Sequence, residues 1–294
     1  MSTRPVCVHE GRNVCGEGPV WDIQEQALYW VDIPEKRIYR RAEADGSVDS
    51  WPVGSDIGAM ALRKDGGFVA ALRDGLTLID PRSGSQRFVL DPEPDEPATR
   101  FNDGKCDRAG RFWVGTCHEV ADPSQRRQIA ALYRIDPDLR CHKIVSGVRT
   151  SNGLDWSPDN RTMYYTDTPT YRIDAFDFDP DTGSVSNRRV FAQLPQGIGR
   201  PDGLAVDAAG YVWSAHFDGW RLTRYTPSGA VDCIVMFPVQ HVTSCAFGGA
   251  DLKTLYVTSA TEDLSPEQLV EQPLAGALFA LRTDVPGLPM SRFS

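Results

Sequence analysis

One pattern of polar and apolar positions recurs six times along the chain. Each unit begins with a small or polar residue and a short apolar strand, passes through a turn rich in Gly, Asp or Pro, and enters a second strand rich in Trp, Tyr, Phe and Val. β-Branched and aromatic runs bounded by turn residues predict strands. The units begin at Glu17, Gly58, Asn102, Asn152, Asp202 and Ser244, and each is therefore roughly 40–50 residues long.

The length of this repeat predicts the fold. A unit of about 40–50 residues is typical of a four-stranded propeller blade. The chain is therefore predicted to be all-β, a six-bladed β-propeller with four-stranded antiparallel blades, formed by residues 1–294 as a single domain. Val6–His9 is expected to be a strand that completes the last blade and closes the ring. The only helix expected is one or two turns within Ser265–Glu271.

The first residues of the six units predict a metal site. In a propeller the innermost strands line a central channel, so equivalent residues gather in a ring at one mouth. Glu17 and Asp202 bring two carboxylates to this ring, and Asn102 and Asn152 bring two amides. Oxygen ligands of these kinds suit Ca²⁺, Mg²⁺ or Mn²⁺, and two carboxylates balance a divalent charge. The competing interpretation is that Asn and Asp merely occupy turns before strands, but it does not explain so many polar residues at one register.

Composition and charge restrict the partners. The chain has 294 residues, of which 41% are hydrophobic, and a net charge of −9, which argues against nucleic acid or an anionic membrane as a partner. No apolar run approaches the roughly 20 residues of a membrane span, and no signal peptide is visible. Seven cysteines without a Cys-x-x-Cys pair predict reduced thiols in a cytoplasmic protein rather than a disulfide framework or a zinc knot.

Four segments carry a resemblance to a known family. They cover the first strands of four repeats in the right order and with the right spacing: Gly16–Trp21, Arg100–Lys105, Ser151–Asp155 and Pro201–Asp207. Over essentially its whole length the chain resembles the senescence marker protein-30/gluconolactonase/luciferin-regenerating family, which includes the regucalcin-like proteins. The resemblance implies a six-bladed propeller with one divalent ion held by a Glu, an Asn and an Asp. By motif these ligands are Glu17, Asn152 and Asp202.

The same resemblance implies substrate-binding residues. Arg100 and Asn102 of the Arg-Phe-Asn-Asp-Gly motif are expected to contact the substrate, as are His118 and Glu119 in the segment that follows Gly115-Thr116. The Thr-x-His-acid pattern of this segment is closer to bacterial sugar lactonases, including xylonolactonase-like members, than to the animal branch.

These residues together predict a metal-dependent sugar lactonase that opens a gluconolactone- or xylonolactone-type ester to the aldonic acid. A bound cation polarises the carbonyl and acidifies a water molecule, while Asp202 is expected both to ligate the ion and to accept the proton of the attacking water. The ion remains open between Ca²⁺, Mg²⁺, Mn²⁺, Zn²⁺ and Fe²⁺. The expected partner is a small sugar lactone, and the expected state is a monomer or a weak homo-oligomer. The alternatives are a phosphotriesterase or arylesterase and a non-catalytic binding propeller.

Other catalytic motifs are missing from the sequence. No Gly-x-Ser-x-Gly elbow of an α/β-hydrolase occurs, and no His-Glu-x-x-His zincin motif occurs among the five histidines. His216 follows the fifth unit's second strand and, together with Asp218 and Trp220, could face the channel mouth. The sequence leaves two roles open for His216, a structural role and contact with the substrate.

Overall fold

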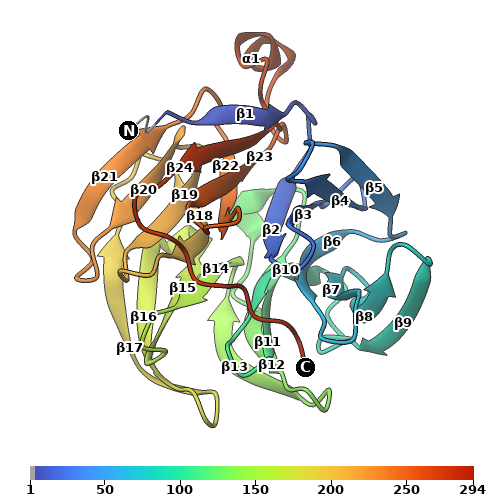
Figure 1. The fold of residues 1–294 in the computed structure, drawn as a ribbon. Coiled ribbons are helices and arrows are strands. Elements are labelled where there is room, and N and C mark those ends of the chain that lie inside the picture. The colour runs from blue at the N-terminus through green and yellow to red at the C-terminus, as the bar shows by residue number, and fades with distance from the viewer. Residues whose placement is uncertain (1–3) are drawn as a thin grey trace.

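The computed structural model describes residues 4–294, which form six four-stranded antiparallel sheets arranged around a central axis (Figure 1). The predicted six-bladed propeller is therefore confirmed. In the first five blades, four consecutive strands pair in chain order. Blade one is β2 (Gly16–Asp22), β3 (Ala27–Asp32), β4 (Arg37–Ala42) and β5 (Val48–Pro52); blade two is β6 (Ile57–Leu62), β7 (Phe68–Leu72), β8 (Gly75–Asp80) and β9 (Ser85–Leu90); blade three is β10 (Thr99–Cys106), β11 (Phe112–His118), β12 (Ala130–Ile135) and β13 (Cys141–Val148); blade four is β14 (Ser151–Trp156), β15 (Thr162–Asp167), β16 (Arg172–Asp179) and β17 (Ser184–Gln193); blade five is β18 (Arg200–Val206), β19 (Val212–Phe217), β20 (Arg221–Tyr225) and β21 (Val231–Met236).

The sixth blade joins the two ends of the chain. It consists of β22 (Val242–Gly248), β23 (Thr254–Ser259), β24 (Leu278–Arg282) and, as the outermost strand, β1 (Val6–His9). β1 runs antiparallel to β24, with Val6 opposite Ala280. The prediction that Val6–His9 closes the ring is confirmed. The loop between β23 and β24 holds α1 (Pro266–Glu271), the short helix expected there, whose N-terminus is capped by Ser265.

Helical segments are few. Apart from α1, residues 4–294 form two single-turn 3₁₀ helices, η1 (Pro123–Gln125) and η2 (Thr168–Thr170). In residues 4–294 no helix is long and apolar enough to cross a membrane.

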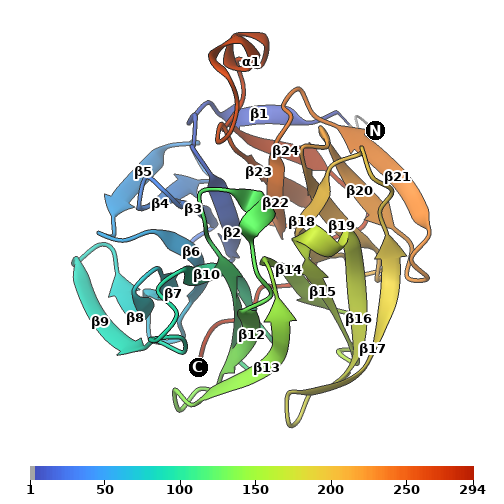
Figure 2. The same cartoon turned by 180° about the vertical axis from the view of Figure 1, so that it is seen from behind.

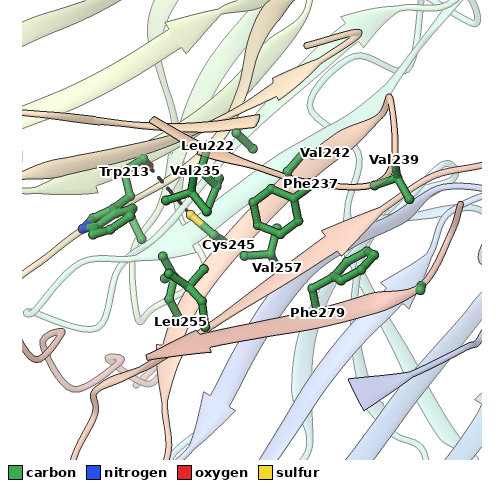
Figure 3. Close-up of a cluster of buried hydrophobic side chains, with 14 of the residues drawn as sticks. Trp213, Leu222, Val235, Phe237, Val239, Val242, Cys245, Leu255, Val257 and Phe279 are labelled. Carbon is green, nitrogen blue, oxygen red and sulfur yellow. Dashed lines mark hydrogen bonds between the residues drawn. The ribbon is translucent and has the colours of Figure 1, made fainter. Parts of the chain in front are cut away.

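The hydrophobic core lies between neighbouring blades. Because each blade packs against a neighbour on both faces, both sets of alternating side chains along a strand are buried. Figure 3 shows the cluster between blades five and six, where Trp213 and Leu222 meet Leu255, Val257 and Phe279. All seven cysteines of the chain are free, as expected, and several pack as small apolar groups.

The turn between the first two strands of a blade contains Asp and Gly, as the sequence pattern predicted. In blade five the amide of Gly210, which has a positive φ of 84°, donates to the carbonyl oxygen of Asp207 at 2.9 Å. The Asp207 carboxylate also accepts from the indole Nε1 of Trp213 at 3.2 Å. The aspartate thus fixes both the turn and the buried aromatic residue of the next strand.

The innermost strands lie unusually close to one another near the axis. All six shift register at the residues that head the repeats; in blade four, for example, the shift falls between Asn152 and Leu154. A Cβ atom on Gly153 would lie 2.4 Å from the carbonyl oxygen of Asp202, so only glycine permits this approach. The glycine thereby lets Asn152 and Asp202, from two neighbouring blades, converge on one point.

The C-terminal segment covers one end of the channel. It crosses the face seen in Figure 1 and contacts blade after blade: the amide of Ala208 donates to Pro286, Gly287 to Leu252, and Phe293 to Leu62. These partners lie where the innermost strands end. The heads of the same strands therefore lie at the opposite mouth, which is the face shown in Figure 2.

Candidate active site

A cavity of about 300 Å³ lies where the heads of the innermost strands meet. Its lining includes four of the six residues that begin the sequence repeats: Glu17, Asn102, Asn152 and Asp202. The loop between β11 and β12 extends across this mouth (Figure 2, green) and contributes further lining residues. The structure thus brings the three predicted metal ligands together in one cavity with Asn102, a predicted substrate-binding residue.

Glu17 and Asp202 place two carboxyl groups in a desolvated position. The two residues are 7% and 5% exposed. Burial raises the pKa of each carboxyl well above its usual range; Asp202 raises that of Glu17 further, and the nearby Asp103 raises both. The only hydrogen bond to the Glu17 carboxylate from the described residues is the Gly18 amide at 2.8 Å. The protein alone therefore leaves much of this negative charge unbalanced, and a cation would stabilise the ionised form.

Asn152 adds an oriented amide oxygen. Its Nδ2 donates to Thr168 Oγ1 at 2.9 Å, and Thr168 in turn donates to the Pro201 carbonyl at 2.8 Å. These two consecutive hydrogen bonds hold Nδ2 of Asn152 and leave its Oδ1 as the atom that can bind a ligand. Asn152 Oδ1 is buried and has no hydrogen-bond partner among residues 4–294, although buried polar atoms are nearly always paired.

The donor set fits a divalent ion that prefers oxygen. Two carboxylates and one orphaned amide oxygen face the same cavity, and hard cations bind such ligands. Within the described part of the chain, no group of three or more His, Cys, Asp or Glu residues forms a candidate metal cluster, so this centre depends on its amide oxygen as well as its two carboxylates. Glu17, Asn152 and Asp202 are thus the residues that would hold a metal ion.

Arg100 is held rigidly beside this centre. Its Nε forms an ion pair with Glu119 Oε1 at 2.7 Å, and its Nη1 donates to Asn102 Oδ1 at 3.0 Å. Asn102 Nδ2 then donates to the Ser151 carbonyl at 2.8 Å. Glu119 also pairs with Arg73, and the two arginines lower the pKa of Glu119 despite the opposing effect of its burial. Arg100 is therefore paired with a carboxylate that directly follows the neighbouring strand β11.

Two histidines lie outside the cavity lining. His118 follows Cys117 and precedes Glu119, both of which line the cavity, and alternation along an extended strand turns it to the other side. Its Nδ1 accepts a hydrogen bond from the Arg127 amide at 2.9 Å. His216 is fully buried, its Nδ1 lies 3.2 Å from the Ile198 carbonyl, and burial lowers its pKa to about 4. The structure brings neither residue to the predicted substrate position.

Several lining residues were not among those the sequence singled out. Four of the ring strands place a second side chain in the cavity two positions before the ring residue, and of these only Arg100 was predicted: Cys15, Arg100, Thr150 and Arg200. The alternation of an extended strand would have identified the other three, since residues i and i+2 point the same way. Arg126, Glu262 and Asp263 also line the cavity. They come from loops, whose positions no periodic signal in the sequence encodes.

The fold and the site define a class of protein: a six-bladed propeller with a carboxylate–amide centre at one mouth of its channel. The family model described as SMP-30/Gluconolactonase/LRE-like region matches residues 15–261, and the chain belongs to this family. The predicted family is therefore confirmed.

Individual relatives agree over nearly the whole length. The 6-deoxy-6-sulfogluconolactonase of Pseudomonas putida is 41% identical over 283 residues, which are 96% of this chain and 95% of the relative. Regucalcin of Gallus gallus is 38% identical over 297 residues, 100% of this chain and 99% of the relative. The crystal structure of regucalcin from Agrobacterium tumefaciens, described as a calcium-binding protein, matches with a TM-score of 0.92 and 27% identity, covering 98% of this chain and 96% of that one. Like its lactonase relatives, the chain is a hydrolase acting on carboxylic ester bonds.

Proposed function

We propose that this hydrolase is a metal-dependent sugar lactonase that opens an aldonolactone to the free acid. The observation that carries the proposal is the convergence of Glu17, Asn152 and Asp202 in one cavity, with two desolvated carboxylates and an unpaired amide oxygen. The names of the relatives supply the substrate class, since one of them acts on a sulfogluconolactone.

The mechanism needs an activated water molecule and a stabilised oxyanion. A divalent ion, when bound, supplies Lewis acidity to the ester carbonyl and lowers the pKa of water. Asp202 accepts the proton of the attacking water, because its carboxylate is buried in the cavity and burial raises its pKa well above the usual range. General-base help of this kind gives about 10²–10⁴-fold. Arg100 and Asn102 bind the sugar hydroxyls and hold the ring. The ion pair with Glu119 keeps the Arg100 guanidinium in place before the substrate arrives.

The ligand set also bears on the identity of the metal. Oxygen ligands alone favour Ca²⁺, Mg²⁺ or Mn²⁺, while Zn²⁺ and Fe²⁺ bind such sites when water completes the shell. A relative of known structure is described as calcium-binding, which supports Ca²⁺ as the first ion to test. The free thiols, including the exposed Cys233, support a reducing compartment such as the cytoplasm.

A lactone panel with controlled metal content tests the proposal. We expect the chelator-treated protein to lose aldonolactone hydrolysis, measured by a pH indicator after subtracting spontaneous opening, and to regain it when one of the five ions is added back. The kcat/KM for a phosphotriester should be at least about 100-fold lower, since a site matched to a planar ester carbonyl gains less from a tetrahedral centre. Undiminished hydrolysis without metal, or a preference for the phosphotriester, would overturn the proposal.

Arg100→Ala should raise KM for aldonolactones by roughly 10–100-fold and leave metal affinity unchanged, because a lost hydrogen bond to a charged group has this size and a cation cannot ligate a metal. Arg100→Lys should restore only part of the loss, because the lysine ammonium keeps the positive charge but cannot donate two parallel hydrogen bonds as the planar guanidinium does. The matched control is Arg73→Ala, which removes the other arginine on Glu119 but lies outside the cavity lining. An unaltered KM in Arg100→Ala across several lactones would assign substrate contact on this strand to Asn102 instead.

A further inference from the structure

One of the three arginines that line the cavity has no anionic partner. Arg100 is paired with Glu119, and Arg200 is paired with Asp218 at 2.7 Å. Arg126 makes no ion pair with any residue between 4 and 294, and its Nε is buried without a hydrogen-bond partner. A buried N–H of a charged group is destabilising when it lacks an acceptor. Such a group is therefore a candidate for binding a ligand rather than for stabilising the fold.

The place of Arg126 in the fold strengthens this interpretation. It lies in the loop between β11 and β12, which crosses the mouth above the inner strands (Figure 2). Residues at the start of the same loop, Glu119 to Ala121, also line the cavity. Burial raises the pKa of the Cys117 thiol, and the positive charges of Arg100 and Arg126 oppose this rise. The guanidinium of Arg126 thus acts on the interior of the cavity, where it faces the same space as Arg100.

The cavity is consequently polarised from its floor to its roof. The carboxyl groups of Glu17 and Asp202 are buried on the inner strands at the floor, whereas Arg126 comes from the covering loop. Of the three remaining acids of the lining, Glu119 is paired with Arg100 and Arg73, and Glu262 and Asp263 are exposed, so water screens them. A substrate whose ester carbonyl lies at the floor therefore extends its far end towards the unpaired guanidinium.

We infer that the lactone substrate carries an anionic group at the carbon farthest from the ester carbonyl, and that Arg126 binds this group. The inference rests on the proposed lactonase function and adds the substrate class. Sulfonate, carboxylate and phosphate share the required chemistry, because each presents two oxygens that match the guanidinium fork. A neutral sugar offers hydroxyl oxygens but no charge to balance the one that Arg126 brings into the cavity.

The test compares glucono-1,5-lactone with three counterparts that carry a sulfonate, a carboxylate or a phosphate at C6. For at least one anionic lactone we expect kcat/KM to exceed that of the neutral lactone by about tenfold or more, mainly through KM, with the best of the three identifying the group. In Arg126→Gln this preference should fall about tenfold or more, the size expected for a hydrogen bond to a charged group. The preference is the ratio of kcat/KM for the anionic lactone to kcat/KM for the neutral lactone. A lower fraction of active enzyme changes both values equally and leaves this ratio unchanged.

The adjacent Arg127 provides the matched control. Its side chain is exposed and outside the cavity lining, so Arg127→Gln should keep the preference, and Arg126→Lys should keep part of it. If the wild-type protein hydrolyses no lactone, the proposed function itself fails and the inference with it. If it hydrolyses neutral and anionic lactones with equal kcat/KM, or if Arg126→Gln leaves the preference intact, only the anion-binding role of Arg126 is overturned.

Discussion

Asp202→Ala is expected to lower kcat/KM for aldonolactones by at least about 10³-fold and to abolish metal binding, while the propeller remains folded. The substitution removes both the proposed metal ligand and the proposed base for the attacking water, and each contribution alone is worth about 10²-fold or more. The fold should persist because the raised pKa of Asp202 shows that its ionised form is disfavoured in the protein alone. The charge of Arg200 and the amide of Asn152 offset only part of the effect of burial, so the removal of Asp202 costs the metal-free protein no net electrostatic stabilisation.

Two further variants make the result specific. Asp202→Asn keeps the size and one oxygen of the side chain but loses the charge and the basicity, so it should resemble Asp202→Ala in rate. Ser244→Ala changes a residue of the same ring register that is buried but outside the cavity lining, and it should retain near wild-type activity. Circular dichroism and thermal unfolding verify the fold. Wild-type hydrolysis by Asp202→Ala would remove this residue from the mechanism.

Glu17→Gln should weaken metal affinity on the order of 100-fold, and Asn152→Ala only about 10-fold. The first change removes a formal charge next to a divalent ion in a desolvated site, where Coulomb energies are several times larger than in water. The second removes a neutral ligand, whose oxygen water can replace. Calorimetric titration of chelator-treated proteins with Ca²⁺ and Mn²⁺ measures both values. The reverse order would show that ligand geometry, not charge, dominates the site.

The pH dependence of the metal-free protein provides an independent readout of the same charge. The pKa of Glu17 is raised in the folded state above its unfolded value. Its contribution to stability is therefore fully present below the ordinary pKa of a glutamic acid and is lost as pH rises through the raised pKa. Metal-free wild type should lose thermal stability over that range, and Glu17→Gln should lose less. Added metal should reverse the trend for the wild type, because binding requires the ionised carboxylate.

Local sequence signals were sufficient for the fold and for the centre of the site. Strand alternation, turn residues and a repeat of similar length can all be recognised in short segments of sequence. Six repeats of this kind predict a propeller, because that architecture buries both faces of every sheet. The register of the repeats predicted that Glu17, Asn102, Asn152 and Asp202 share one ring, and the family resemblance selected Glu17, Asn152 and Asp202 among them and added Arg100. Alternation along the strand places Arg100 on the same side as Asn102, and the same rule applied to Cys117 and Glu119 turns His118 away from the cavity.

Only the tertiary structure decided which charges are paired. Arg100 had acidic neighbours in the stretch 91–97, yet its partner is Glu119, which directly follows the adjacent strand. Arg126 has Asp122 four residues before it in the chain, but that carboxylate is engaged by Ser124 in its own loop. Ion pairing depends on distances through space between side chains from different segments, and these distances exist only once the ring has closed. The sequence therefore determined the ring and the polar residues that converge at its mouth, and the folded loops decided which arginine of the cavity is left without an anionic partner.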